Sequence, residues 1–354
     1  MSFPIQEALQ LKQKPADSSK LAFGTVFTDY MFLMNYDVEQ GWHSPRIEPY
    51  APISLEPAAM CLHYGQEVFE GMKAYRAPDG RVLLFRPEKN FERMNLSNRR
   101  MCIPDIDEAL ALQALKELVR LEQAWIPDGE GTSLYIRPFI IATDPHVGVR
   151  SASHLLFMII LCPVGPYYPE GLNPVKIYVE QQYVRAVKGG TGFAKTAANY
   201  AVSLKAQEVA HELGYNQVLW LDGRENKYVE EVGAMNVFFQ LGDEIVTPSL
   251  EGSTLSGITR MSCLELLRDW GFRVSERRLA LQELEAAAAS GTLREAFGTG
   301  TAAVISPIGE LRIGEQTVII NNGEIGPVAQ RLYDTLTAIQ NGRTEDSYGW
   351  MTEV

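Results

Sequence analysis

Strand-like segments joined by very short turns are the feature that most constrains the fold of this chain. Residues 72–76 and 81–85 flank the turn Ala77-Pro78-Asp79-Gly80, so they form a predicted hairpin. Helical periodicity is equally clear at 109–125, where apolar residues recur on one face. Because consecutive strands are often joined by short turns, the mixture predicts an α+β fold and not a doubly wound parallel sheet.

The remaining expected elements follow from apolar periodicity and from Gly and Pro punctuation. Further strands are expected at 133–142, 154–162, 175–183, 217–221 and 229–239. Further helices are expected from Pro87 onward and at 199–213, 259–270 and 327–340. Gly214 and Gly271 follow two of these helices as expected C-terminal caps, and Pro327 suits a first helical position.

A chain of 354 residues is too long for one small core, so two domains are expected. The segment from Gly165 to Pro174 is rich in Pro and Gly and is the best linker candidate. We therefore expect a small N-terminal α+β domain at 1–165, a linker at 166–174 and a large C-terminal domain at 175–354.

Charge and hydropathy exclude several classes of function. The net charge is −12 and no dense basic cluster is present, which argues against a nucleic-acid partner. The longest apolar run, 155–162, is too short to span a bilayer, so no membrane partner is expected. The N-terminal residues resemble neither a signal peptide nor a presequence, which favours a cytoplasmic location.

Metal-binding patterns are missing. The four cysteines are widely spaced without a C-x-x-C pair, and we interpret them as reduced core residues. His211 is followed by Glu212, but no second histidine stands at the spacing that a zinc protease needs. No metal site is expected.

Lys195 lies in the most informative stretch, Gly189-Gly190-Thr191-Gly192-Phe193-Ala194-Lys195-Thr196. One interpretation is a phosphate-binding loop, but the glycine that should precede its lysine is replaced by Ala194. A second is a lysine that forms a Schiff base with a carbonyl group. A third is an ordinary lysine in a glycine-rich turn.

Two adjacent acids, Glu230 and Glu231, lie within the apolar run 228–239. A buried carboxylate is costly unless a cation accompanies it. Alternation along a strand would direct the two side chains to opposite faces, so at most one should face the interior. A cofactor with a protonated ring nitrogen would suit that one, whereas an edge strand with both acids in solvent explains them equally well.

Taken together, these motifs resemble the branched-chain aminotransferases, which are pyridoxal 5'-phosphate (PLP) enzymes. The resemblance spans nearly the whole chain and rests on the order and spacing of blocks that are individually weak. Besides the lysine and glutamate motifs, these blocks are 23–31, 62–65, 69–75, 84–87 with Arg93-Met94, 131–138, 255–260 and 297–302. The resemblance implies a two-domain, fold type IV PLP-dependent aminotransferase similar to D-amino-acid aminotransferase, with PLP bound by the C-terminal domain.

The resemblance also implies cofactor roles for individual residues. Lys195 matches the Schiff-base lysine, which would also carry the proton between substrate and cofactor. Glu231 matches the partner of the protonated ring nitrogen, and Tyr200 the partner of the ring hydroxyl. The phosphate would be bound by groups that match Arg93, the backbone N–H groups of Ile258 and Thr259, and the Thr301 hydroxyl. Without the resemblance, the serine and glycine before Ile258 are only a helix cap.

Substrate residues are implied in the same way. The α-carboxylate would be held by Tyr135 and by the Thr301-Ala302 backbone, with Arg137 on the same strand face orienting the tyrosine hydroxyl. The side-chain pocket would be formed by Phe27, Tyr64, Phe69, Tyr167 and Ala234. Val147 and Val149 match a loop that completes the site of a neighbouring subunit, so a homodimer is expected.

The implied reaction is reversible transamination of L-leucine, L-isoleucine and L-valine with 2-oxoglutarate, giving branched-chain 2-oxo acids and L-glutamate by ping-pong chemistry. The chain departs from some relatives in two features. Ala303 and Ser306 stand where those proteins have a C-x-x-C pair, and Ala234 replaces a threonine. The rivals are a D-amino-acid aminotransferase or aminodeoxychorismate lyase, a P-loop protein, and a PLP carrier without activity.

Overall fold

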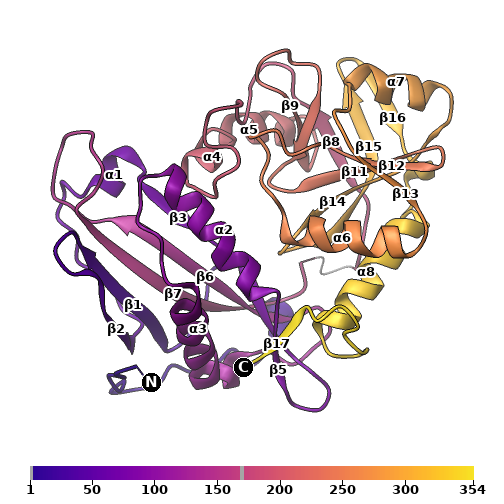
Figure 1. The fold of residues 1–354 in the computed structure, drawn as a ribbon. Coiled ribbons are helices and arrows are strands. Elements are labelled where there is room, and N and C mark those ends of the chain that lie inside the picture. The colour runs from indigo at the N-terminus through magenta and orange to yellow at the C-terminus, as the bar shows by residue number, and fades with distance from the viewer. Residues whose placement is uncertain (1–2, 168–170) are drawn as a thin grey trace. The chain divides into compact units, whose positions relative to one another are not determined.

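The computed structural model describes residues 3–167 and 171–354, and within it the backbone forms two compact units (Figure 1). Unit 1 contains the chain up to residue 167 together with 194–197 and 338–354, and unit 2 contains 171–193 and 198–337. The expected division differs in two segments, since 194–197 and the C-terminal 338–354 belong to unit 1. For the C-terminal segment the reason is strand pairing, because β17 (Met351–Glu353) joins β5 (Val82–Phe85). Part of the predicted linker, 168–170, lies outside the described residues.

Unit 1 is built on an antiparallel sheet of eight strands. The order is β17-β5-β4-β6-β7-β1-β2, and β3 pairs with β6. The remaining bounds are β1 (Tyr30–Asp37), β2 (Gly41–Pro49), β3 (Glu67–Phe69), β4 (Met72–Arg76), β6 (Ser133–Ala142) and β7 (His154–Val164). The predicted hairpin is confirmed as β4 and β5.

Two helices cover one face of this sheet, α2 (Pro87–Arg100) and α3 (Glu108–Glu122) (Figure 1). Their buried residues Phe91 and Leu115 share a core with Leu134 and Ile136 of β6. Because side chains alternate along a strand, Tyr135 and Arg137 face the other side of the sheet. Unit 1 also contains the short segments η1 (Ser18–Lys20), α1 (Met60–Tyr64) and η2 (Gln123–Trp125).

Unit 2 is built on a mixed sheet of nine strands. The order is β10-β9-β8-β15-β14-β11-β12-β13, and β16 pairs with β15. Strand β8 runs parallel to β9 and β15, and β12 runs parallel to β13. The bounds are β8 (Val175–Val179), β9 (Gln217–Leu221), β10 (Val229–Val232), β11 (Asn236–Leu241), β12 (Glu244–Thr247), β13 (Arg273–Glu276), β14 (Leu293–Gly300), β15 (Val304–Ile313) and β16 (Gln316–Ile319).

The helices of unit 2 are α4 (Ala198–Ala201), α5 (Leu204–Glu212), α6 (Ile258–Asp269), α7 (Leu281–Ala289), η3 (Asn321–Gly323) and α8 (Pro327–Gln340), whose last residues belong to unit 1. The predictions for β6, β7, β9, α2, α6 and α8 are confirmed within a few residues at their ends. Within the described ranges, no helix has both the length and the apolar composition that a membrane crossing requires.

Three predicted elements are wrong in extent. The expected strand 175–183 ends at Val179. The expected helix 199–213 is interrupted after Ala201, where the Ser203 hydroxyl donates to the Tyr200 carbonyl. The expected strand 229–239 is broken by a tight turn in which Gly233 adopts a φ of 57°. Apolar composition alone did not reveal these turns.

Candidate functional site

Lys195 lies in unit 1, in the short segment 194–197. Its backbone N–H donates to Ser97 Oγ at 2.8 Å, and its carbonyl accepts the N–H of Phe69 at 3.0 Å. The Thr196 hydroxyl donates to the carbonyl of Glu67 at 2.6 Å. The lysine Nζ lies 4.8 Å from the centroid of the Phe69 ring. Helix α2 and strand β3 therefore fix the backbone that carries this amine.

Arg93 on α2 forms a buried ion pair with Glu70. Its Nε lies 2.8 Å from one carboxylate oxygen and its Nη2 lies 2.8 Å from the other. Asn90, one helical turn earlier, donates to the same carboxylate at 2.7 Å, and the Gly71 N–H donates at 3.2 Å. Glu70 is fully buried, so the arginine compensates a charge that water cannot reach.

Tyr135 and Arg137 lie on the sheet face opposite the helices. Arg137 Nη2 donates to the Tyr135 hydroxyl at 3.0 Å, which is the contact expected from their spacing. The guanidinium also lies 4.6 Å from the centroid of the Phe69 ring. A Cβ at Gly71 would overlap the Tyr135 hydroxyl oxygen, so that hydroxyl needs a glycine beneath it. Phe27 packs against Tyr135 in the same cluster.

Four other predicted substrate residues of unit 1 are on its surface. Val147 and Val149 are 69% and 85% exposed. Tyr64 and Tyr167 are also exposed. The structure thus gathers Phe27, Phe69, Tyr135 and Arg137, whereas these four side chains are exposed.

In unit 2, Glu230 and Glu231 are both buried, so the prediction that at most one faces the interior is wrong. The pairing of β10 with β9 is irregular between Val229 and Val232, and both carboxylates contact the segment 253–255. Glu231 Oε2 lies 3.2 Å from Arg185 Nε, and its Oε1 accepts the N–H of Leu255 at 2.8 Å. Glu230 accepts a hydrogen bond from the Ser253 hydroxyl, and burial raises the pKa of Glu230 to about 7. The segment 253–255 therefore covers both acids, which lie on the edge strand β10.

The same segment leads into helix α6. Asn236 Nδ2 donates to the Leu255 carbonyl at 2.9 Å, and a Cβ at Gly257 would overlap Asn236 Oδ1. Gly257 is the N-cap residue of α6 and has no side chain to accept from the first helical N–H groups. Such a helix start, which includes Ile258 and Thr259, is suited to bind an anion.

Further predicted residues of unit 2 lie at the same end of the sheet. Asn236 pairs with Thr299 at the beginning of β11 and the end of β14. The turn that contains Ala234 precedes β11, and Thr301-Ala302 follow β14, so both turns lie at this end. Thr299 Oγ1 is buried and, among the described residues, has no hydrogen-bond partner. Tyr200 lies on α4 and is half-buried.

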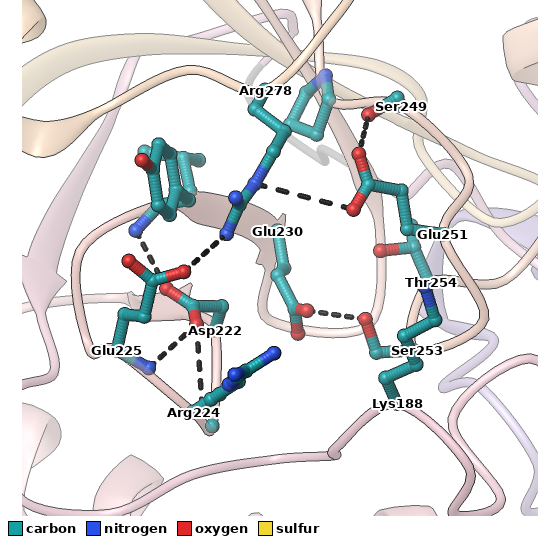
Figure 2. A pocket seen from close by; sticks show the side chains of 14 residues that line it. Lys188, Asp222, Arg224, Glu225, Glu230, Ser249, Glu251, Ser253, Thr254 and Arg278 are labelled. Carbon is teal, nitrogen blue, oxygen red and sulfur yellow. Dashed lines mark hydrogen bonds and ion pairs between the residues drawn. The ribbon is translucent and has the colours of Figure 1, made fainter.

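Figure 2 shows a separate cavity of about 240 Å³ in unit 2. Glu230 lines it, as do Asp222, Glu225, Glu251 and Arg278. Arg278 lies 3.0 Å from Glu225 and 4.0 Å from Glu251, and Asp222 accepts four backbone N–H groups of its own loop. Glu231 does not line this cavity. Among the charges around it, Arg278 is thus paired with Glu225 and Glu251.

Several residues around these groups were not predicted from the sequence. They are Ser97, which binds the lysine backbone, Glu70, Arg185 and Asn236. The only signal for Glu70 was an acid within an apolar block. Arg185 gave no signal, because its carboxylate partner is 46 positions away in the sequence.

Comparison with known proteins gives concordant matches. A profile described as amino-transferase class IV matches residues 67–311. Branched-chain-amino-acid aminotransferase 2 of Bacillus subtilis (strain 168) is 60% identical over 348 residues, which is 98% of this chain and 96% of that protein. The solved branched-chain amino acid aminotransferase of Escherichia coli has a TM-score of 0.74 at 25% identity and covers 91% of this chain and 98% of its own.

A third similar protein was solved with a ligand. The branched-chain amino acid aminotransferase of T.th., complexed with N-(5'-phosphopyridoxyl)-L-glutamate, has a TM-score of 0.73 at 26% identity. It covers 90% of this chain and 97% of its own.

Proposed function

This chain belongs to the branched-chain-amino-acid aminotransferases of class IV, and from that premise we propose that it transfers the amino group of L-leucine, L-isoleucine or L-valine to 2-oxoglutarate. The products are the branched-chain 2-oxo acid and L-glutamate, formed in two half-reactions. The observation that supports this most strongly is the anchored Lys195. Its backbone is bound by Phe69, which lies in one of the family blocks, and by Ser97 on α2.

PLP fits the groups that each unit presents. Unit 1 offers a lysine amine and a buried arginine. Unit 2 offers a buried carboxylate beside a helix start and the buried hydroxyl of Thr299. A phosphate suits the helix start, and a protonated ring nitrogen suits the carboxylate. When bound, PLP supplies a ring that withdraws electrons from the substrate α-carbon.

We assign the covalent link and the proton transfer to Lys195. Hydrogen bonds at its N–H and its carbonyl fix the backbone of Lys195. Its Nζ lies beside the Phe69 ring. In its neutral form such an amine attacks a carbonyl. The same amine would carry the proton from the substrate α-carbon to the carbonyl carbon of the cofactor. Glu231 would hold the ring nitrogen, Tyr200 the ring hydroxyl, and Arg93, Ile258, Thr259 and Thr301 the phosphate.

One pocket must accept an apolar chain and a second carboxylate. The cluster of Phe27, Phe69 and Tyr135 supplies apolar surface, and Arg137 supplies a cation that already stacks on Phe69. We propose that Arg137 binds the second carboxylate of 2-oxoglutarate, and that Ala234 and Ala302 contact substrate from unit 2. The exposed Val147 and Val149 are proposed to complete the site of a partner subunit in a homodimer, with Tyr64 and Tyr167 lining the pocket. A cytoplasmic location stays a prediction.

The test is a visible absorbance titration of the PLP-loaded protein. We expect L-isoleucine to remove the band of the bound cofactor and 2-oxoglutarate to restore it. The Lys195→Ala variant should lack this cycle. A band that ignores L-isoleucine but responds to a D-amino acid would contradict the proposal and favour the D-amino-acid enzymes.

A further inference from the structure

Arg185 forms a buried ion pair with the predicted ring-nitrogen partner, Glu231. The arginine side chain is 6% exposed, that of Glu231 is 5% exposed, and the Nε–Oε2 distance is 3.2 Å. A buried carboxylate without a cation is strongly disfavoured. The second carboxylate oxygen accepts a hydrogen bond from the Leu255 N–H. Arg185 therefore compensates the charge of Glu231, and the Leu255 N–H orients its carboxylate.

Arg185 makes a second contact that Glu231 does not share. Its Nη2 donates to the carbonyl of Ser253. The glycine-rich segment packs against the same carbonyl at Gly192. A Cβ at this position would overlap the Ser253 carbonyl oxygen and the Cβ of Ala186. This explains why a glycine stands at 192, three positions before Lys195. The arginine thus links strand β10 to the segment 253–255.

That segment leads directly to the proposed phosphate site. From Leu255 it continues through Gly257 into the first turn of α6. Its carbonyl at 255 is held by Asn236 and its N–H at 255 by Glu231. A guanidinium that binds both Glu231 and Ser253 therefore acts on the groups proposed for the two ends of the cofactor at once.

We propose that Arg185 is a positioning residue, which fixes Glu231 and the segment 253–257 in the arrangement that binds PLP. This rests on the proposed function, because Glu231 and the start of α6 are the groups assigned to the cofactor. Arg185 contacts these cofactor-binding groups through its Nε and its Nη2, and it acts through them.

The experiment measures PLP affinity, the visible spectrum and kinetics for four variants. These are Arg185→Met, Arg185→Lys, Glu231→Gln and the double variant Arg185→Met/Glu231→Gln. For Arg185→Met we expect PLP affinity, measured by tryptophan quenching of the apoprotein, to fall by about tenfold or more, with a shifted cofactor band. We expect kcat to fall by a similar factor, while KM for L-isoleucine stays within about threefold.

The double variant tests whether Arg185 acts partly through Glu231. If it does, the double variant loses less PLP affinity than the product of the two single losses, because both changes break the same ion pair. Losses that multiply would overturn the proposal. Arg185→Lys keeps the charge but has one donor head, so it should fold and recover only part of the affinity. Full recovery with lysine, or wild-type affinity and spectrum in Arg185→Met, would also overturn it.

Two controls separate the causes. Arg278→Met removes a partly exposed arginine of the same unit and should leave PLP affinity unchanged. If Arg185→Met does not fold, by circular dichroism, the decision rests on Arg185→Lys and the charge-free double variant. A wild-type protein without a cofactor band would contradict the proposed function itself. A wild-type protein with that band, together with Arg185 variants of unchanged PLP affinity and spectrum, would contradict only this inference.

Discussion

Each unit contains a deeply buried arginine–glutamate pair. The two pairs differ in which partner is proposed to bind the cofactor and which partner supports it. In unit 1 the arginine, Arg93, is the group proposed to bind the cofactor, and Glu70 is its support. In unit 2 the glutamate, Glu231, is the proposed cofactor group, and Arg185 is its support. In both, the supporting residue supplies the opposite charge that burial requires. A buried counterion therefore accompanies each of the two proposed cofactor groups.

The pairs also differ in the geometry of their contacts. Glu70 accepts from Arg93, Asn90 and Gly71, so its carboxylate is fully engaged by unit 1. Glu231 accepts from Leu255 and faces Arg185 Nε at 3.2 Å, a longer contact. The first pair is expected to contribute mainly to stability, and the second mainly to the reaction.

The largest expected effect comes from breaking the unit 1 pair. Arg93→Met leaves Glu70 charged and without its cation, so the apoprotein should lose about 3–5 kcal/mol of unfolding free energy. Urea unfolding followed by circular dichroism measures this. Lys89→Met is the matched control, because it removes an exposed pair with Glu92 on the same helix and should cost at most about 0.5 kcal/mol. Equal losses in the two variants would contradict the assigned role of burial.

The next effect comes from neutralising the acid of unit 2. Glu231→Gln keeps the shape but not the charge, so kcat should fall about 100-fold, or about 2.7 kcal/mol of transition-state stabilisation. Stopped-flow measurement of the half-reaction with L-isoleucine reports this. Glu230→Gln changes the neighbouring residue, which lines the separate cavity and not the proposed cofactor site, and should change kcat far less. Similar rates for both variants would remove Glu231 from the reaction.

A smaller effect concerns the substrate face of unit 1. Gly71→Ala places a Cβ against the Tyr135 hydroxyl, and overpacking of this kind costs about 1–3 kcal/mol. KM should rise for both L-isoleucine and 2-oxoglutarate, because the hydroxyl is displaced from Arg137. The thermal stability lost in Gly71→Ala should be partly recovered in Gly71→Ala/Tyr135→Phe. No recovery would show that the strain lies elsewhere.

The smallest effect compares one acid in each unit. Burial raises the pKa of Glu122 in unit 1 and of Glu230 in unit 2 to about 7. An acid whose pKa is raised by folding stabilises the protein fully below its unfolded pKa of about 4.5, and this contribution is lost as pH rises through about 7. Melting temperatures should therefore fall between about pH 5 and 8. Glu122→Gln and Glu230→Gln should each flatten the curve. Unchanged curves would contradict the burial of these acids.

The sequence predicted most of the elements that carry the site, because apolar periodicity and Gly or Pro punctuation are local signals. It predicted helix α2 from Pro87 and the shared face of Tyr135 and Arg137 for this reason. It missed the turn at Gly233, because an apolar run continues on both sides. It also missed Glu70, Arg185 and Ser97 as supports, since each acts on a residue that lies far away in the sequence and is brought near only by folding.

The tetrapeptide 194–197 has a consequence for how this gene can recombine. Residues on both sides of it belong to unit 2, yet the partners that fix it, Ser97, Phe69 and Glu67, belong to unit 1. A crossover that exchanges the sequence after residue 171 with that of a relative would bring a foreign lysine segment to native partners. Lys195, the proposed Schiff-base lysine, therefore depends for its position on residues outside the exchanged part. Two of these partners are backbone groups, the Phe69 N–H and the Glu67 carbonyl, so a chimaera should retain activity when the parent that supplies residue 97 has a hydroxyl there.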